Sequence, residues 1–223
     1  QQENPIPKAY ARWDNFRILQ EMMEKRLNRM MSNLANNSKL KSGSIEQKIG
    51  DFYWSGMNQT AINRDGYSPL HPILQRIEAV ATLNDLQALV PELQLMGVNV
   101  LFGFGSMQDF KNSQAMIAGA MQGGLGLPDR DYYCLDDQKS QQIRKQYQQH
   151  IINVFQLVGE SLPQAQQNAD KIMAIETALA KASLTQIEQR DPYAIYHKMP
   201  LAILKQLTPH FAWESYLKKL GLT

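Results

Sequence analysis

The stretch Leu125-Gly126-Leu127-Pro128-Asp129-Arg130-Asp131-Tyr132-Tyr133 marks a border between two kinds of sequence. Before it lies a Gly-rich, strand-like segment, residues 98–124, and after it begins a long amphipathic helical pattern. A proline, alternating Asp and Arg charges and two tyrosines in so short a run are an uncommon combination. The run therefore predicts a change of secondary structure and carries most of the information on what kind of protein this is.

The segment before the border has the two-residue period of a strand. Val98, Val100, Phe102 and Phe104 alternate with small or polar residues, so their side chains fall on one face. Residues 108–112 have turn chemistry, and alternation returns in residues 113–121. We predict an antiparallel β-hairpin with a long loop over about residues 98–122. An Ala-rich helix is the alternative for the second arm.

Elsewhere the apolar residues recur at steps of three and four, which is the spacing of one helix face. This pattern covers residues 13–34, 44–59, 74–80, 83–96, 143–158, 163–182, 201–207 and 213–220. Asp14 or Asn15 is expected to cap the first helix, and Ser44 with Gln47 forms a predicted capping box for the second. The predicted fold class is mainly α: a multi-helix domain with a small antiparallel β-hairpin, forming a single region over residues 1–223.

The composition is that of an ordinary globular protein. The chain has 223 residues, 43% hydrophobic and 20% charged, with a net charge of +2 and interspersed signs. There is no basic stripe for a phosphate backbone, so nucleic acid is a poor candidate partner. No apolar run reaches the roughly 20 residues that span a bilayer. One cysteine, Cys134, excludes an intrachain disulfide, which fits a reducing compartment or an exported bacterial protein without disulfides.

A complete set of catalytic residues is not recognisable in the sequence. None of the four histidines lies three or four residues from another, and none is followed by Glu, so the helical zinc motif is absent. Cys134 lacks a partner cysteine and a nucleophile pattern. Gly103-Phe104-Gly105 lacks the third glycine of a dinucleotide loop, and Gly123-Gly124-Leu125-Gly126 lacks the Lys-Ser/Thr ending of a phosphate loop. We predict neither catalytic nor metal-binding residues in this chain.

The ordered series of short motifs resembles the N-terminal part of the neprilysin-type (M13) zinc metallopeptidases. The matching residues are Ile6-Pro7, Arg12 to Phe16, Ile18-Leu19, Asp51 to Tyr53, Met57-Asn58, Ile62, Gly66, Pro69-Leu70, Phe102, Gly105, Asp109, Lys111 to Ser113, Gly124 to Tyr133, Glu176, Arg190 to Pro192, Tyr196 and Lys198-Met199. They occur in family order over almost the whole chain. Gly56 stands where mammalian members carry a cysteine, which points to a bacterial, oligopeptidase O-like member.

The resemblance implies a two-domain peptidase that hydrolyses short peptides with zinc. In that family the zinc motif and the catalytic acid/base residues lie in the C-terminal half, and none of these motifs occurs here. We therefore expect an N-terminal fragment, inactive alone and without zinc of its own, whose partners are peptide substrates and the C-terminal catalytic half of the same protein. Apolar faces that pack on that half would be uncovered, so self-association of the fragment is also expected.

Two residues are assigned to substrate binding by the resemblance alone. Arg12 is the position whose guanidinium pairs with the C-terminal carboxylate of a peptide, a role that suits the planar Arg fork. Phe16 resembles a residue that walls the pocket for the side chain after the scissile bond. Gln20 replaces a second family Arg, and Arg17 replaces an Asp, so dipeptide-releasing specificity does not carry over directly.

The sequence leaves both the function and the location of the protein open. The chain is part of a peptidase, a non-enzymatic α-helical protein-interaction module, or part of a peptidase relative that has lost its catalysis. For a bacterial peptidase of this type an extracytoplasmic location, periplasmic or membrane-anchored, is favoured, with the cytoplasm as the alternative. Residues 1–10 are polar and contain two prolines, so they do not form a secretion signal.

Overall fold

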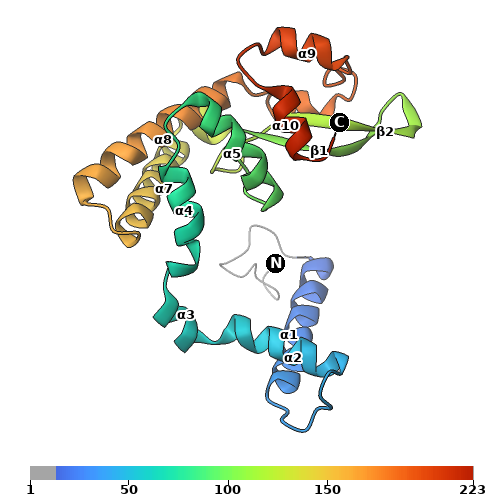
Figure 1. Ribbon diagram of the computed structural model, residues 1–223, viewed down its shortest axis with the longest axis vertical. Helices are drawn as coiled ribbons and strands as arrows, with labels where there is room; N and C mark the ends of the chain where they lie inside the picture. The colour runs from blue at the N-terminus through green and yellow to red at the C-terminus, as the bar shows by residue number, and fades with distance from the viewer. Residues whose placement is uncertain (1–13, 223) are drawn as a thin grey trace. The chain divides into compact units, whose positions relative to one another are not determined.

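The structure, a computed structural model, describes residues 14–222. The chain divides into two compact units, Gln1–Pro69 and Leu70–Thr223. The fold is mainly helical with one two-stranded antiparallel sheet, as predicted (Figure 1). No helix between residues 14 and 222 has both the length and the apolar character needed to cross a bilayer.

The first unit is built on a pair of helices, α1 (Asn15–Ala35) and α2 (Ile45–Met57), followed by α3 (Gln59–Asp65). A 3-10 turn at Ser68–Leu70 spans the boundary between the units in the sequence. Asp14 caps α1 by accepting a hydrogen bond from the Arg17 backbone N–H at 2.8 Å. Gly50 lets the two helices approach closely, because a Cβ there would lie 2.8 Å from the Leu34 carbonyl group. The pair is therefore fixed by a cap at one end and by close backbone contact at the other.

Two local expectations in this unit need correction. The Ser44 hydroxyl accepts from the Gln47 N–H at 3.2 Å, but the Gln47 side chain accepts from Gly43 rather than from Ser44, so the capping box is incomplete. The helix predicted over residues 44–59 also breaks at Asn58. The Asn58 side chain accepts from the Ala61 N–H at 3.1 Å and starts α3 as a new helix.

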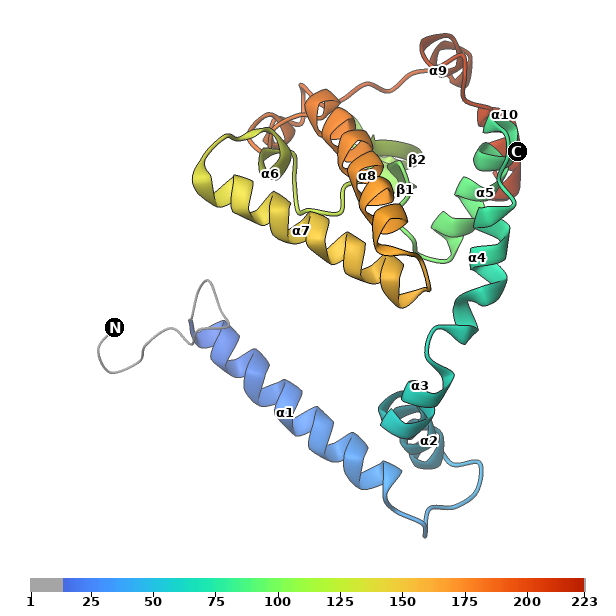
Figure 2. The same ribbon diagram turned by 90° about the vertical axis from the view of Figure 1, so that its left-hand side faces the viewer.

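The second unit carries the hairpin and the remaining helices. Its elements are α4 (His71–Glu78), α5 (Leu83–Leu95), β1 (Phe102–Asp109), β2 (Asn112–Gln122), α6 (Asp131–Cys134), α7 (Gln138–Leu157), α8 (Leu162–Ala182), a 3-10 turn at Glu188–Arg190, α9 (Leu201–Leu207) and α10 (Trp213–Lys219). Helices α7 and α8 run side by side, as Figure 2 shows. Ile151 and Ile152 of α7 pack there on Ala165 and Ala169 of α8.

A second core joins α5, the hairpin and α10. Val90, Trp213 and Tyr216 are buried in it. The Phe102 ring lies 5.6 Å from both the Trp213 and the Tyr216 ring, in the range of favourable aromatic contacts. This cluster connects residues more than a hundred positions apart in the sequence and positions the hairpin on the helices.

The hairpin is confirmed, with two changes. Both arms are strands, so the helical alternative for the second arm is wrong, and Asp109 pairs with Asn112 across a tight turn rather than a long loop. The first strand begins at Phe102 instead of Val98. Leu101 has a φ of 60°, and the Phe102 N–H donates to the Val100 carbonyl at 2.7 Å, so the chain turns sharply just before the strand.

Candidate functional site

Of the two predicted substrate-binding residues, one lies in the described part of the chain. Phe16 is in the first turn of α1, and 86% of its side chain surface is exposed. Arg12 lies outside the described residues. Phe16 is therefore open to contact with another molecule or segment, while the substrate-binding roles of both residues stay predictions.

Arg17 and Gln20, which by the resemblance replace an Asp and an Arg, contact each other along α1. An Arg17 guanidinium N–H donates to the Gln20 side chain oxygen at 2.9 Å. The Gln20 amide in turn donates to Glu24 at 2.9 Å. Arg17 and Gln20 thus belong to one exposed hydrogen-bonded row on the helix that begins beside Phe16.

Residues 125–133 are held by a partly buried cluster of two tyrosines and a glutamate. The Tyr133 hydroxyl accepts from the Leu127 N–H at 2.9 Å and donates to Glu176 Oε2 at 2.5 Å. The Tyr147 hydroxyl donates to the other Glu176 oxygen at 3.1 Å. A Cβ at position 126 would lie 1.8 Å from the Tyr147 hydroxyl, so the glycine makes room for it. Residues of α6, α7 and α8 are joined here through one carboxylate.

The electrostatics of this cluster keep both phenols protonated. Burial, followed by the Glu176 hydrogen bond, raises the pKa of Tyr133 far above its usual range. Burial and the nearby Glu176 charge raise the pKa of Tyr147 to about 12. Both hydroxyls remain hydrogen-bond donors at neutral pH, so they hold Glu176 and join the three helices.

The charged residues of the same run anchor it to the end of α8. Asp129 Oδ1 accepts from the Asp131 N–H at 2.8 Å, and Asp129 Oδ2 accepts from the Gln186 amide at 2.7 Å. Arg130 Nε donates to the Ala180 carbonyl at 3.2 Å. The Asp129 and Arg130 side chains are thus held by contacts within the second unit.

A second polar cluster lies at the tip of the hairpin. Asp109 is buried, and it accepts hydrogen bonds from the Tyr196 hydroxyl at 2.8 Å, Lys198 Nζ at 2.6 Å and the Lys111 N–H at 3.0 Å. The Lys198 hydrogen bond, with those of Lys111 and Tyr196, lowers the pKa of Asp109 to about 2. The ammonium group of Lys111 lies over the Tyr196 ring, 4.6 Å from its centre. Asp109 therefore ties residues 196–198 to the hairpin.

Sequence reasoning missed Gln94, which holds the turn before β1. Its amide donates to the Val100 carbonyl at 3.0 Å and to the Phe102 carbonyl at 2.8 Å. Its side chain oxygen accepts from the Tyr216 hydroxyl. A single glutamine in an amphipathic helix has no local signal that separates this role from that of a surface residue.

Metal-ligating side chains do not gather in the described part of the chain. Among residues 14–222, no three His, Cys, Asp or Glu side chains come together in a group that could hold a metal ion. The donor set that zinc requires is therefore not found among residues 14–222.

Comparison with known proteins identifies the family. The family model for peptidase family M13 matches residues 1–223. The chain belongs to peptidase family M13. Human endothelin-converting enzyme 1 is 29% identical over 97% of this chain and 28% of its own length. Human membrane metallo-endopeptidase-like 1 is 31% identical over 90% of this chain and 27% of its own length.

Solved structures of M13 peptidases share the fold. The Mycobacterium tuberculosis zinc metalloprotease Zmp1 in complex with an inhibitor matches with a TM-score of 0.85 and 31% identity, over 98% of this chain and 33% of that one. PepO from Lactobacillus rhamnosis HN001 matches with a TM-score of 0.77 and 15% identity, over 97% of this chain and 34% of that one, which shows the fold alone. The chain thus spans about a third of the solved structures and less than a third of the curated relatives.

Proposed function

We propose that this chain is the N-terminal, substrate-enclosing part of a zinc-dependent metalloendopeptidase that hydrolyses short peptides. The observation that carries the proposal is the M13 match over the whole chain, combined with its coverage of about a third of Zmp1, a protein described as a zinc metalloprotease. The rival interaction module has no comparable observation in its favour.

In this proposal the zinc belongs to the remainder of the polypeptide. When bound there, zinc polarises the water that attacks a peptide carbonyl. The present chain contributes binding and exclusion of larger substrates, and it is inactive alone. Self-association of the isolated chain and an extracytoplasmic location remain predictions that belong to the same proposal.

The proposed substrate contacts are Arg12 and Phe16. The Arg12 guanidinium would pair with the C-terminal carboxylate of a short peptide. Phe16 would contact the side chain after the scissile bond, and its 86% exposure on the first turn of α1 leaves it accessible for that contact.

The test uses the full-length protein with zinc and fluorogenic peptides. Arg12→Ala is expected to lower kcat/KM by about 10- to 100-fold for peptides with a free C-terminal carboxylate, because hydrogen bonds between charged groups contribute about 1.5–3 kcal/mol. The same peptides with an amidated C-terminus should be affected far less. Phe16→Ala should lower kcat/KM by about tenfold when a large apolar residue follows the scissile bond.

Two control variants lie on α1. Arg26→Ala and Met22→Ala remove an exposed Arg and an exposed apolar side chain from α1 and should leave kcat/KM for both substrates unchanged. A full-length protein that binds zinc and cleaves none of a broad set of short peptides would contradict the proposed function. An equal loss of kcat/KM in Arg12→Ala for peptides with a free and with an amidated C-terminus would contradict the role of Arg12.

A further inference from the structure

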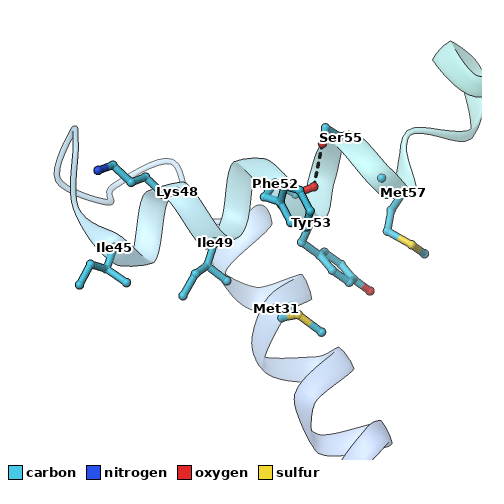
Figure 3. Close-up of a pocket in the computed structure, with 9 residues that line it drawn as sticks. Met31, Ile45, Lys48, Ile49, Phe52, Tyr53, Ser55 and Met57 are labelled. Atoms are coloured by element: carbon cyan, nitrogen blue, oxygen red, sulfur yellow. Dashed lines mark hydrogen bonds between the residues drawn. The ribbon is translucent and has the colours of Figure 1, made fainter. Parts of the chain in front are cut away.

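An apolar groove is built into the first unit beside the contact of α1 with α2. Its volume is about 490 Å³, and its walls include Ile45, Ile49, Phe52 and Met57 of α2 and Met31 of α1. Ile45 and Ile49 project from α2 on the side where Met31 lies (Figure 3). Phe52 is 83% exposed and Ile45 72% exposed, so nothing within residues 14–69 covers them.

The two helices that frame this groove are held at a fixed separation. The close contact of Gly50 with the Leu34 backbone sets the separation of the two helices. The Ser32 hydroxyl lies 3.3 Å from the Tyr53 hydroxyl and forms a hydrogen bond across the same contact. Ile45, Ile49 and Phe52 are spaced by four and three residues, which places them in one ridge along α2.

The chemistry of the groove favours a helix over an extended peptide. An extended peptide needs hydrogen-bond partners for its backbone N–H and C=O groups. The groove offers almost no polar surface, and the Ser55 hydroxyl at its edge already donates to the Phe52 carbonyl at 2.7 Å. A helix satisfies its own backbone and presents only side chains, so it can fill an apolar groove next to another helical ridge.

The length of the relatives indicates where such a helix comes from. Zmp1 aligns with 98% of this chain through only 33% of its own length, so about two thirds of an M13 polypeptide lie outside the matched part. A segment of the same polypeptide meets the groove at a high effective concentration, which a second copy or a free partner lacks. We infer that the α1–α2 groove is the docking site for an apolar helix from the part of the full-length polypeptide that follows residue 223. This inference rests on the proposed function only in requiring that the polypeptide continues.

The test places a photo-crosslinker in the groove of the full-length protein. Phe52→p-benzoylphenylalanine exchanges one exposed aromatic side chain for another, so the fold is retained. After irradiation, mass spectrometry should find residue 52 joined to a peptide from beyond residue 223. Leu157→p-benzoylphenylalanine is the background control, because Leu157 is a 76% exposed helical residue of the second unit. Cross-links common to both sites are discarded.

A second variant tests the groove itself. Ile49→Glu should reduce the yield of the specific cross-link from position 52 on the order of tenfold, because a carboxylate must then enter an apolar contact. Leu157→Glu should leave that yield unchanged. A mixture of ¹⁵N-labelled and unlabelled protein separates cross-links within one polypeptide from those between copies.

The outcomes separate this inference from the proposed function. Cross-linking to residues 70–223, to a second copy, or to nothing overturns the inference, whatever the peptidase activity. A specific cross-link beyond residue 223 in a protein without peptidase activity supports the inference and contradicts the proposed function. Peptidase activity together with a cross-link from residue 52 to residues 70–223 supports the proposed function and overturns the inference.

Discussion

The two compact units of the chain bury their apolar side chains to very different extents. The second unit contains two buried clusters, one between α7 and α8 and one around Trp213 and Tyr216. Among residues 14–69 of the first unit, Gly50 is the one buried residue. The second unit therefore carries a core of its own, whereas the first consists of a helix pair whose apolar surface remains to be covered.

The largest expected contrast is between two tryptophans. Trp213 is 6% exposed and contacts Phe102, Phe211 and Tyr216, so Trp213→Ala should lower the free energy of unfolding by about 3–5 kcal/mol. Trp54 of α2 is 55% exposed, and Trp54→Ala should change the free energy of unfolding by about 0.5 kcal/mol or less. Urea unfolding of the 223-residue chain followed by far-UV circular dichroism measures both. Equal losses would show that the first unit has a core after all.

A pair of glycines sharpens the comparison at a smaller scale. Gly126→Ala places a methyl group where the Tyr147 hydroxyl lies and should lower the free energy of unfolding by about 1–3 kcal/mol. Gly56→Ala in α2 meets nothing within 4 Å and should stabilise its helix by about 0.5–1 kcal/mol. The measurement is the same urea titration. A neutral Gly126→Ala would mean that Tyr147 moves away freely and that the Glu176 cluster is not rigid.

The smallest expected effect is a pH dependence located at the hairpin tip. Hydrogen bonds from Lys198, Lys111 and Tyr196 lower the pKa of Asp109 from 3.8 to about 2. Because the folded pKa is depressed, this stabilisation is present above pH 3.8 and is lost as the pH falls toward 2. Asp109→Asn should therefore lower Tm at pH 5. The difference in Tm between the variant and wild type should shrink between pH 4 and pH 2.

Asp51→Asn, a change of the same type at an exposed position of α2, is the control for the removal of one carboxylate. Scanning calorimetry at a series of pH values provides the comparison. A difference between Asp109→Asn and wild type that stays constant down to pH 2 would contradict the assigned cause of the low pKa.

Much of the fold was predictable because its signals are local. The spacing of Phe16, Leu19, Met23 and Leu27 predicts α1, and the cap at Asp14 fixes where it begins. The start of β1 was not predictable in this way. Val98 and Val100 alternate like strand residues, but Gln94, held by Tyr216 from far along the chain, keeps the backbone turned until Phe102.

The candidate site shows the same limit. The run of residues 125–133 was recognisable, and it led to the correct family, but its physical purpose depends on contacts of Tyr133 and Tyr147 with Glu176, tens of residues away. Sequence spacing does not reveal such contacts. The helix break at Asn58 was missed for the opposite reason, since one side chain there competes locally with a helical pattern that otherwise continues.

The Asp109 anchor has a consequence for the order of folding. Its partners Tyr196 and Lys198 lie 87 and 89 residues later in the sequence. Tyr216, the partner of Gln94, lies 122 residues after it. Contacts closed over such long loops form late, whereas neighbours in sequence such as α7 and α8 can pair early. During synthesis on the ribosome, the hairpin thus emerges well before Tyr196 and Lys198, and these contacts form only after α7 and α8 have also emerged.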